Sequence, residues 1–465
     1  MMKINTRSIR MLSDQLTPVS AYLKIRDITS KPCLLESNDY QSYENSRSII
    51  GFDPLIEISL DQDRLIVTTL GRKESIAPGG RNSIPQLLNQ VRTSIINEGE
   101  ETEINGFFGH TNFEAVRHFD SVRMDTTNNH LDIPDLHYFF YRYLIVFDHY
   151  RDQMTLIENV PDGGTSDLVK IKKILLMGHF EEKSFSRTGQ SRSNMTDDEY
   201  RDLVSKGKYH CKVGDVFQIV LSRQFQQPYE GDDFTVYRVL RSVNPSPYLY
   251  YFDLGHYHIF GSSPESQLNI SDGMARVNPI AGTYRRTGND RQDILRAREL
   301  TEDPKEVAEH TMLVDLARND LGRHTSEISI KSLMEIQYFS HVIHLVSTVE
   351  GKLPDEYNPF RIYADTFPAG TLSGAPKIMA MELINRYEKS LRGPYGGGIG
   401  YFGLDGHITQ AIVIRSFVSK NQVLYSQAGA GIVISSEEES ELQEVNNKLA
   451  ALNTALEQAE QILTY

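Results

Sequence analysis

Cysteine is scarce in this chain of 465 residues, which contains only Cys33 and Cys211. Two cysteines so far apart are too few for a disulfide framework, and they lack the clustered partners that a structural zinc site needs. This usage is typical of a reducing compartment, and no secretory signal pattern opens the sequence. We therefore expect a cytoplasmic protein without disulfide bonds.

Long hydrophobic runs and an excess of positive charge are also missing. The most apolar run, Leu136–Phe147, includes His137 and Arg142 and is shorter than the ~20 apolar residues that span a membrane, so a buried aromatic strand is predicted. Against 62 acidic residues stand 48 basic ones, giving a net charge of -14. We expect neither nucleic acid nor a membrane as partner, and an anionic substrate requires locally placed cations.

The distribution of turn residues divides the sequence into two regions. Short β-type runs broken by Gly, Pro, Asn and Asp predict a mainly-sheet region over residues 1–185. A polar, Ser-rich stretch at 184–196 is the best linker candidate. Helices alternate with strands over residues 186–465, where Gly398–Gly403 followed by His407–Ser416 indicates antiparallel pairing. We expect the two regions to interleave in one compact unit, with the functional site in the second.

One predicted helix carries a pair of glutamates on a single face. Asp303 is the expected N-cap, Pro304 occupies the first helical position, and Glu306 is expected to close a capping box. Glu309 follows Glu306 at a spacing of three, so both carboxylates point to the same side.

A second predicted helix repeats this pattern near the end of the chain. It is expected to begin at Ser435 or Ser436 and to continue through the 450s, which places Glu441, Glu444 and Lys448 on one face. Four glutamates brought together form an oxygen-rich site of the kind that Mg²⁺ prefers. On spacing alone, two solvated helix faces explain the pattern more often.

Three glycine-rich segments permit close backbone approach to a ligand. Gly370–Lys377 is not a phosphate-binding P-loop, because its lysine does not directly follow the second glycine. Gly396–Gly400 lacks the dinucleotide-binding spacing. Gln427–Gly431 offers another close approach, and Arg415, expected at the end of a strand over Ala411–Ile414, can bind a carboxylate through two N–H groups.

Together these segments resemble the large subunit (component I) of anthranilate synthase, within the family of chorismate-utilising enzymes. The resemblance extends, more weakly, to the first half of the chain through Leu34–Ser37 and Ser48–Pro54. It implies an α+β fold, in which an antiparallel β-sheet sandwich is flanked by helices. The stronger matches, in chain order, are Gly214–Gln218, Gly261–Glu265, Pro279–Thr283, Glu309–Asp320, His341–Ser347, Gly370–Lys377, Tyr395–Phe402 and Glu441–Lys448.

The resemblance also implies a role for each matching residue. Glu265 corresponds to the acid at the leaving hydroxyl group and His344 to the group that assists loss of pyruvate, with Thr371 and Gln218 beside them. Glu309 and Glu444 correspond to Mg²⁺ ligands, with Glu306 and Glu441 close behind. The groups implied to bind chorismate are Gly282, Thr283, Tyr395, Arg415, Gly429, Ala430, Gly431 and Lys448.

Two positions separate this chain from relatives with other products. Relatives that add water to chorismate carry a lysine base where this chain has Gln218, and many that form 4-aminodeoxychorismate carry a nucleophilic lysine where it has Ala281. Neither residue here is a base or a nucleophile, so direct addition of ammonia is implied. The large subunit of 4-aminodeoxychorismate synthase is an alternative, because some of these enzymes also lack the lysine. A non-catalytic tryptophan-sensing subunit is an alternative from another class.

Regulation and a partner follow from the same resemblance. Two segments match those that form a feedback site for L-tryptophan, with Arg47 and Leu249 standing where relatives often have Lys and Met. Neither cysteine lies in a glutaminase nucleophile motif, so ammonia is expected from a separate glutamine amidotransferase subunit (component II) in a heterotetramer. The implied tryptophan contacts are Glu36, Ser37, Arg47, Pro247, Tyr248 and Leu249.

Overall fold

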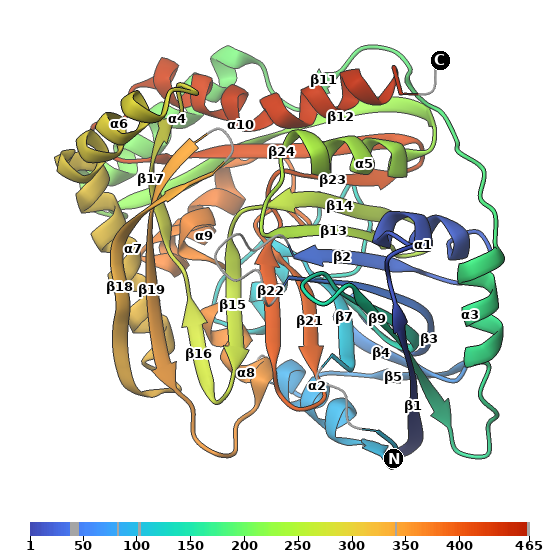
Figure 1. Cartoon of the computed structure of the whole chain (residues 1–465). Helices are drawn as coiled ribbons and strands as arrows, with labels where there is room; N and C mark the ends of the chain where they lie inside the picture. Colours follow the sequence, from blue (N-terminus) through green and yellow to red (C-terminus); the bar gives the residue numbers. More distant parts are fainter. Residues whose placement is uncertain (38–45, 81–82, 101–103, 340–341, 463–465) are drawn as a thin grey trace.

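A computed structural model describes residues 1–37, 46–80, 83–100, 104–339 and 342–462 of the chain. One extensive antiparallel sheet curls through the molecule, with helices along its outer faces (Figure 1). The expected α+β class, with antiparallel sheet flanked by helices, is confirmed. His341, which opens one of the sequence motifs, lies outside the described residues.

The sheet is an unbroken series of antiparallel strand pairs. It begins at the edge strand β18, passes through the centre at β8, and ends at β12. The strands in spatial order are β18 (Ser326–Tyr338), β19 (Val342–Lys352), β16 (Met274–Val277), β15 (Ser266–Ser271), β22 (Ile408–Ile412), β21 (Gly398–Gly403), β7 (Gly106–Thr111), β8 (Leu136–Asp148), β3 (Arg47–Asp61), β2 (Cys33–Ser37), β13 (Tyr248–Asp253), β14 (His258–Ser263), β23 (Ser416–Lys420), β24 (Val423–Ile432) and β12 (Gln218–Gly231).

Further strands extend this series at several places. The only parallel pair among the described strands joins β1 (Met2–Leu12) to β6 (Ile95–Asn97). The others are antiparallel: β9 (Gln153–Pro161) joins β8 to β1, β4 (Arg64–Thr69) and β5 (Arg72–Ile76) extend β3, β17 (Ile280–Arg285) pairs with β19, and β10 (Phe185–Arg187), β11 (Arg192–Ser193) and β20 (Gly374–Ala375) pair with β12.

The two halves of the sequence share this sheet. β7 pairs with β21 and β2 pairs with β13, so strands from before and after residue 185 are hydrogen-bonded neighbours. The polar stretch at 184–196 contributes β10 and β11, which pair with β12. The boundary between residues 185 and 186 stays a prediction.

Strand β8 is the predicted buried aromatic strand, and nearly all of its residues are buried. It lies between β3 on one side and β7 and β9 on the other, so both of its edges are paired. Its two polar interruptions have partners: His137 Nε2 lies 2.7 Å from Glu57 Oε1, and Arg142 Nη2 lies 2.9 Å from Glu158 Oε1. These pairs allow polar side chains in an otherwise apolar strand.

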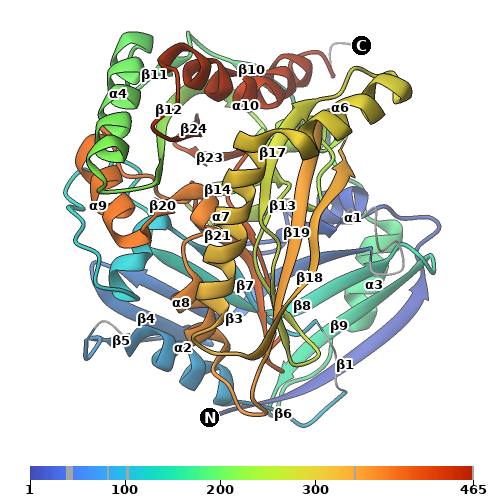
Figure 2. The ribbon, with the colours of Figure 1, turned by 90° about the vertical axis from the view of Figure 1, so that its left-hand side faces the viewer.

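The helices cover the outer faces of the sheet. Helix α10 packs on β24 and contacts α4 and α5, while α7 packs against β17 and β19. Figure 2 shows α7 running upright in front of the strands and α10 above them. The helices are α1 (Pro18–Ile25), α2 (Ser83–Thr93), α3 (Leu168–Met177), α4 (Asp197–Val213), α5 (Asp233–Val243), α6 (Asp290–Glu302), α7 (Pro304–Leu321), α8 (Pro359–Thr366), α9 (Lys377–Tyr387) and α10 (Glu438–Ala459).

The starts of the two glutamate-bearing helices differ from expectation. Asp303 caps α7 as predicted, but its carboxylate accepts from the N–H groups of Lys305 and Glu306, and no capping box forms. Helix α10 begins after an N-cap at Glu437, because the Ser436 hydroxyl accepts a hydrogen bond from Val433 N at 3.1 Å and does not cap the helix. Within the described residues, no helix is long and apolar enough to cross a membrane.

Candidate active site

Helices α7 and α10 bring four glutamates into one electrostatic neighbourhood. Burial raises the pKa of Glu309, and the carboxylates of Glu306 and Glu444 raise it further. Burial and the Glu444 carboxylate also raise the pKa values of Glu306 and Glu441. Glutamates from both helices therefore repel one another across a shared space, which the resemblance implied and their spacing alone did not.

Glu309 is held by the first residue of β12. The Gln218 amide Nε2 donates to Glu309 Oε1 at 2.9 Å, while Gln218 Oε1 is buried without a hydrogen-bond partner. Gly431 on β24 makes room for this contact, since a Cβ there would lie 2.6 Å from Gln218 Nε2. Gln218 therefore leaves an unused acceptor beside the carboxylate.

Glu306 is held by the backbone of β17. Its Oε2 accepts a hydrogen bond from Thr283 N at 3.3 Å. The sequence had predicted instead that Glu306 would close a capping box at the start of α7. The preceding residue, Gly282, has a φ of +80°, a conformation that favours glycine. This bulge in β17 turns the Thr283 N–H toward α7.

Glu444 and Lys448 form an ion pair one helical turn apart on α10. Lys448 Nζ lies 2.7 Å from Glu444 Oε1 and also donates to the Gly429 carbonyl at 2.8 Å. Gly429, Ala430 and Gly431 all lie on β24 opposite β12. The expected substrate-side residues of α10 and β24 are therefore in direct contact.

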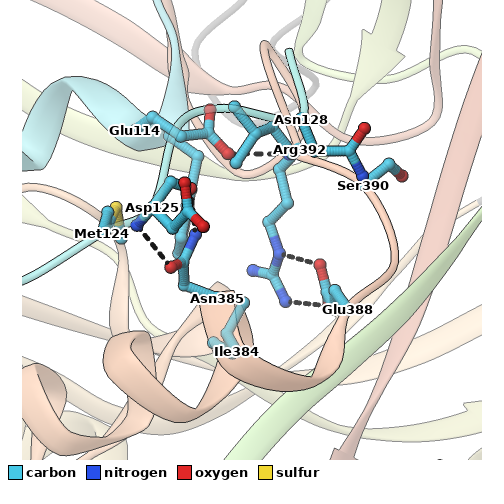
Figure 3. A pocket seen from close by; sticks show the side chains of 11 residues that line it. Glu114, Met124, Asp125, Asn128, Ile384, Asn385, Glu388, Ser390 and Arg392 are labelled. Carbon is cyan, nitrogen blue, oxygen red and sulfur yellow. Dashed lines mark hydrogen bonds and ion pairs between the residues drawn. The ribbon is translucent and has the colours of Figure 1, made fainter. Parts of the chain in front are cut away.

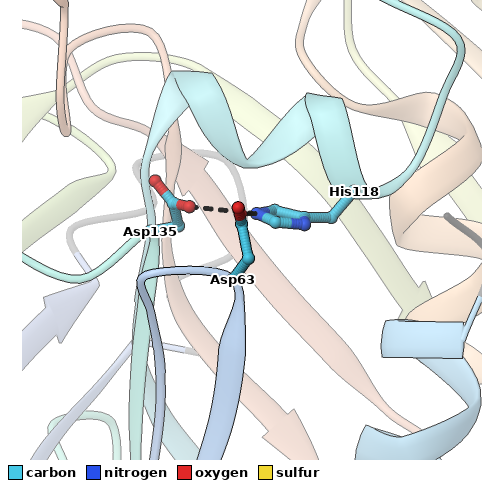
Figure 4. A group of neighbouring side chains, drawn as sticks. All are labelled: Asp63, His118 and Asp135. Atoms are coloured by element: carbon cyan, nitrogen blue, oxygen red, sulfur yellow. Dashed lines mark hydrogen bonds and ion pairs between the residues drawn. The ribbon is translucent and has the colours of Figure 1, made fainter. Parts of the chain in front are cut away.

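The described residues contain one compact trio of metal-ligating groups, and it lies elsewhere. Asp63, His118 and Asp135 place one ligand atom each within 4.8 Å of one another (Figure 4). Arg117 Nη2 lies 2.6 Å from Asp135 and 3.1 Å from Asp63, so this trio is already an ion-pair cluster. No three of the α7 and α10 glutamates, all of which are described, form such a trio; Glu444 instead pairs with Lys448, and Glu309 accepts from Gln218.

The donor set of the glutamates nevertheless fits a divalent cation. All four offer hard carboxylate oxygens, and burial, with repulsion between neighbouring carboxylates, raises the pKa values of three of them. A cation there offsets both the desolvation and the repulsion. The buried, unpaired Gln218 Oε1 adds a further oxygen beside Glu309.

Glu265 is a buried carboxyl group whose ionisation is disfavoured. It follows β14, and Thr371 Oγ1 donates to its Oε1 at 2.8 Å. Burial raises its pKa to about 7, although Lys448 and Arg415 oppose the shift. The cause is burial alone, and the neighbouring glutamates that the sequence suggested make no contribution. Glu265 can therefore hold a proton near neutral pH.

His344 lies on β19, as its sequence pattern predicted, and faces the same space. Its Nδ1 lies 2.9 Å from Thr283 Oγ1 and 3.3 Å from the Gly282 carbonyl. A carbonyl only accepts, so we assign the proton to Nδ1, which leaves Nε2 basic. Burial, with the nearby Arg415 and Lys448 charges, lowers its pKa to about 4. The ring is therefore neutral and able to accept a proton.

Arg415 supplies a cation without a partner. Its guanidinium makes no hydrogen bond or ion pair with any described residue, yet its charge influences both Glu265 and His344. It does not end a strand as expected: β22 ends at Ile412, and Arg415 adopts a φ of +50° in the turn before β23. Its carbonyl accepts from Ser262 N at 3.2 Å, which fixes this turn.

Tyr395 is supported by residues that the sequence argument missed. The Arg392 guanidinium lies 5.6 Å from the centre of the Tyr395 ring and pairs with Glu388 at 2.7 Å. Figure 3 shows this pair among the residues that line a pocket, and the volume of this pocket is about 200 Å³. The Glu114 carboxylate accepts from the N–H groups of Arg392 and Gly393, so it fixes the turn before Tyr395. The only sequence signal was the spacing of four between Glu388 and Arg392.

The family described as chorismate binding enzyme matches residues 31–454. The chain belongs to the chorismate-binding enzymes. It is 33% identical to the anthranilate synthase component 1 of Acetivibrio thermocellus, over 98% of this chain and 96% of that protein. It is 36% identical to that of Thermus thermophilus, over 97% of both chains. Among solved structures, anthranilate synthase component I from Streptococcus pneumoniae TIGR4 superposes with a TM-score of 0.77 at 31% identity, covering 96% of this chain and 99% of that one.

The two positions that the resemblance predicts to distinguish relatives by product, 218 and 281, both lie near α7. Gln218 contacts Glu309, and Ala281 lies on β17 directly before Gly282. Ala281 is 8% exposed, and its carbonyl lies 3.2 Å from His310 Nδ1. The site therefore has no lysine at either position.

The two segments matched to a tryptophan site are neighbours in the sheet of this chorismate-binding enzyme. Ser37 pairs with Tyr248 and Glu36 with Leu249 across β2 and β13. The buried Glu36 carboxylate already accepts from Tyr237 Oη at 2.7 Å and from Arg241 Nε at 3.0 Å.

Arg47 and Pro247, the other residues matched to the tryptophan site, lie next to the paired strands β2 and β13. Arg47 opens β3 next to Ser48, the partner of Glu36 across β2 and β3, and Pro247 directly precedes β13. The structure therefore brings both segments together. Their ligand stays a prediction.

Replacing Glu265 by Gln is expected to stabilise the fold at pH 8 but hardly at pH 5. A carboxyl group with a raised pKa costs folding free energy when it ionises, and this cost is absent below its ordinary pKa of 4.5 and complete above about 7. The amide removes the charge and keeps an acceptor for Thr371. The free energy of unfolding should rise by up to about 3 kcal/mol at pH 8 and by less than about 1 kcal/mol at pH 5. Denaturant unfolding measures both, and equal effects at the two pH values would contradict the burial argument.

Proposed function

We propose that this chain is the large, chorismate-binding subunit of an anthranilate synthase. It converts chorismate and ammonia into anthranilate and pyruvate, the first step of L-tryptophan biosynthesis, in the cytoplasm. The observation that carries this proposal is the combination of a Glu265 whose pKa is raised to about 7 and a His344 whose pKa is lowered to about 4, in a site that has no lysine at positions 218 and 281. The names of its relatives support the same activity.

Chorismate carries two carboxylates, and the site offers a positive group for each. The unpartnered guanidinium of Arg415, with Tyr395, receives the carboxylate of the enolpyruvyl arm. The ring carboxylate faces the glutamates of α7 and α10, where Glu309 and Glu444, with Glu306 and Glu441 behind them, would hold Mg²⁺. When bound, this cation neutralises the ring carboxylate. Gly282, Thr283 and the backbone of residues 429–431 complete the contacts.

The amination step uses Glu265 as an acid. Ammonia forms a bond to C2 of the ring while the C4–O bond breaks, and the double bonds shift between them. Glu265 gives its proton to the departing hydroxyl group, which leaves as water. A carboxyl group with a pKa of about 7 is protonated often enough to do this near neutral pH. Thr371 keeps the acid in place through its hydrogen bond.

The elimination step uses His344. The aminated intermediate loses the proton at C2 to Nε2, the bond between the ring and the enolpyruvyl oxygen breaks, and the ring becomes aromatic. The released enolpyruvate takes up a proton and becomes pyruvate. Because Nδ1 is held by Thr283 and Gly282, the basic Nε2 has a fixed direction.

Product identification tests the activity. The purified chain is incubated with chorismate, Mg²⁺ and ammonium chloride, anthranilate is followed by its fluorescence, and pyruvate is measured with lactate dehydrogenase. Anthranilate with equimolar pyruvate is the expected result. Aminodeoxychorismate without pyruvate would assign the chain to the other amination chemistry, and no turnover at all would favour a non-catalytic sensing subunit.

Replacing Glu309 by Gln is expected to reduce kcat/KM by about 100-fold or more, because a charged oxygen ligand is lost from the cation site. Asp315→Asn, on an exposed face of the same helix, is the matched control and should keep the normal rate. A Glu309→Gln enzyme with near-normal kcat/KM at limiting Mg²⁺ would refute the assignment of Glu309.

The paired segments of β2 and β13 are proposed to bind L-tryptophan. Saturating tryptophan should lower the chorismate affinity by about 5- to 150-fold, the usual range of coupling between two sites. Tyr248→Ala should abolish this effect and leave turnover without tryptophan unchanged. Steady-state kinetics measure both, with L-phenylalanine as the control ligand. Unchanged turnover of the unmodified protein in saturating tryptophan would refute the proposed regulation.

A further inference from the structure

Two charged residues that end matched motifs have no role in the proposed mechanism. Lys377 ends the glycine-rich segment that begins at Gly370, and Asp320 ends the segment that begins at Glu309. Lys377 Nζ lies 2.7 Å from Asp320 Oδ2, and each of the two side chains is only 14% exposed. Taking both charges out of water costs free energy, which their mutual attraction offsets only in part. The ion pair is therefore better explained by the contacts that it fixes than by stability.

Lys377 closes the base of the connection between α8 and α9. Besides its ion pair, its ammonium group donates to the Thr366 carbonyl at 3.1 Å. Thr366 is the last residue of α8, and Lys377 is the first residue of α9. One side chain therefore joins the two ends of this connection, and the ion pair with Asp320 ties both ends to α7.

The Thr366 carbonyl also holds the strand that follows the acid. Gln267 Nε2 donates to this carbonyl at 3.2 Å, and Gln267 lies on β15, two residues after Glu265. Glu265, Gln267, Asp320, Thr366 and Thr371 line one cavity of about 30 Å³. The ion pair is therefore a neighbour of the acid, although it is not in contact with it.

The connection between α8 and α9 carries the residue that holds the acid. Its 3₁₀ turn η3 (Gly370–Leu372) lies directly against α7, because a Cβ at Gly370 would lie 2.2 Å from Leu316 Cδ2. Thr371 is the middle residue of this turn, and its hydroxyl donates to Glu265 Oε1 at 2.8 Å. The position of Thr371 therefore depends on how closely the connection is held to α7.

The ion pair acts on Glu265 through position and not through charge. The charges that act on the pKa of Glu265 are those of Lys448 on α10 and Arg415 in the turn before β23, and both lower it. The Thr371 hydroxyl lowers this pKa too, because it donates to the ionised carboxylate, whereas burial raises it. A displacement of Thr371 therefore changes the proton affinity of the acid.

We propose that Lys377 is a positioning residue of the reaction: paired with Asp320, it holds Thr371 at hydrogen-bonding distance from the acid Glu265. This inference rests on the proposed function and adds how the acid is kept in place. The contacts of Lys377 are with Asp320 and Thr366, so it acts on the acid only through the connection that it closes. A misplacement of about 1 Å at a catalytic contact can lower a rate by about 100-fold.

Two variants remove the closure. Lys377→Met keeps the apolar stem of the side chain and loses both of its polar contacts. Lys377→Met combined with Asp320→Asn also neutralises the carboxylate that the single variant leaves unpaired, which protects the fold. Thr371→Val, which removes the hydrogen bond to the acid directly, is the reference. Glu350→Gln, which removes the carboxylate from a half-buried ion pair with Arg276 between β19 and β16, is the matched control.

Steady-state turnover is measured against pH with ammonium chloride, at a constant concentration of free ammonia. We expect both Lys377 variants to lower kcat by about tenfold or more and to change the KM for chorismate by less than about twofold. The alkaline limb of kcat/KM should move to higher pH, because a hydrogen bond that favours the carboxylate is lost. Adding Thr371→Val should change little more, since both substitutions remove the same contact. The Glu350→Gln control should keep the normal kcat and pH profile.

An unchanged pH profile, or a loss of kcat that adds in full to that of Thr371→Val, would overturn the proposal. Infrared spectroscopy follows the same shift without substrate. The carboxylic acid band that disappears in Glu265→Gln should persist to higher pH in Lys377→Met than in the unmodified chain. An unshifted band would also overturn the proposal, whatever reaction the chain catalyses. Absence of anthranilate with the unmodified chain would instead refute the proposed function.

Discussion

Repulsion among the carboxylates of α7 and α10 is the constraint around which the site is arranged. Burial and mutual repulsion raise the pKa values of Glu306, Glu309 and Glu441, so this arrangement costs folding free energy. Groups of the surrounding sheet and of α10 itself offset part of this cost. Gln218 donates to Glu309, the bulge at Gly282 turns an N–H toward Glu306, and Lys448 pairs with Glu444. Because these carboxylates repel one another, a bound cation would stabilise the site. The same cation would attract an anionic substrate.

Beside the negatively charged glutamates, the site also contains two positive side chains, Arg415 and Lys448, which act on Glu265 and His344. Burial raises the pKa of Glu265 to about 7 against the opposing charges of Lys448 and Arg415, whereas at His344 burial and the same two charges act together and lower the pKa to about 4. In water near pH 6, a glutamate side chain is largely ionised, and a histidine side chain is present in both its protonated and its neutral form. Burial therefore prepares both an acid and a base, and both are influenced by the charges of Arg415 and Lys448. Glu265 lies directly before β15 and His344 lies on β19, and β16 pairs with both of these strands.

Local sequence was sufficient to predict the elements, and resemblance was needed for the site. The buried strand β8, the Asp303 cap of α7 and the β21–β22 hairpin follow from patterns of a few residues. The start of α10 and the turn at Arg415 did not, because Ser436 is engaged by Val433 and Arg415 takes a left-handed conformation, both set by tertiary contacts. Arg392 and Glu114 were missed for the same reason: the buried pair of Arg392 with Glu388, and the hydrogen bonds from the Arg392 and Gly393 N–H groups to Glu114, leave almost no periodic signal. Spacing showed that two glutamates share a face, but not that two helices face each other.

Strand β13 links the two sets of residues that the sequence separated into regulation and catalysis. One of its edges pairs with β2, which places Ser37 opposite Tyr248; its other edge pairs with β14, which places Tyr248 opposite Ser263. Ser263 Oγ accepts from Glu265 N at 3.4 Å, so the acid is two residues and one hydrogen bond from Tyr248. Strands in an antiparallel ladder move together, because slipping one breaks every hydrogen bond of the pair. A ligand that displaces β13 therefore displaces β14, and with it the carboxyl group whose burial sets its proton affinity.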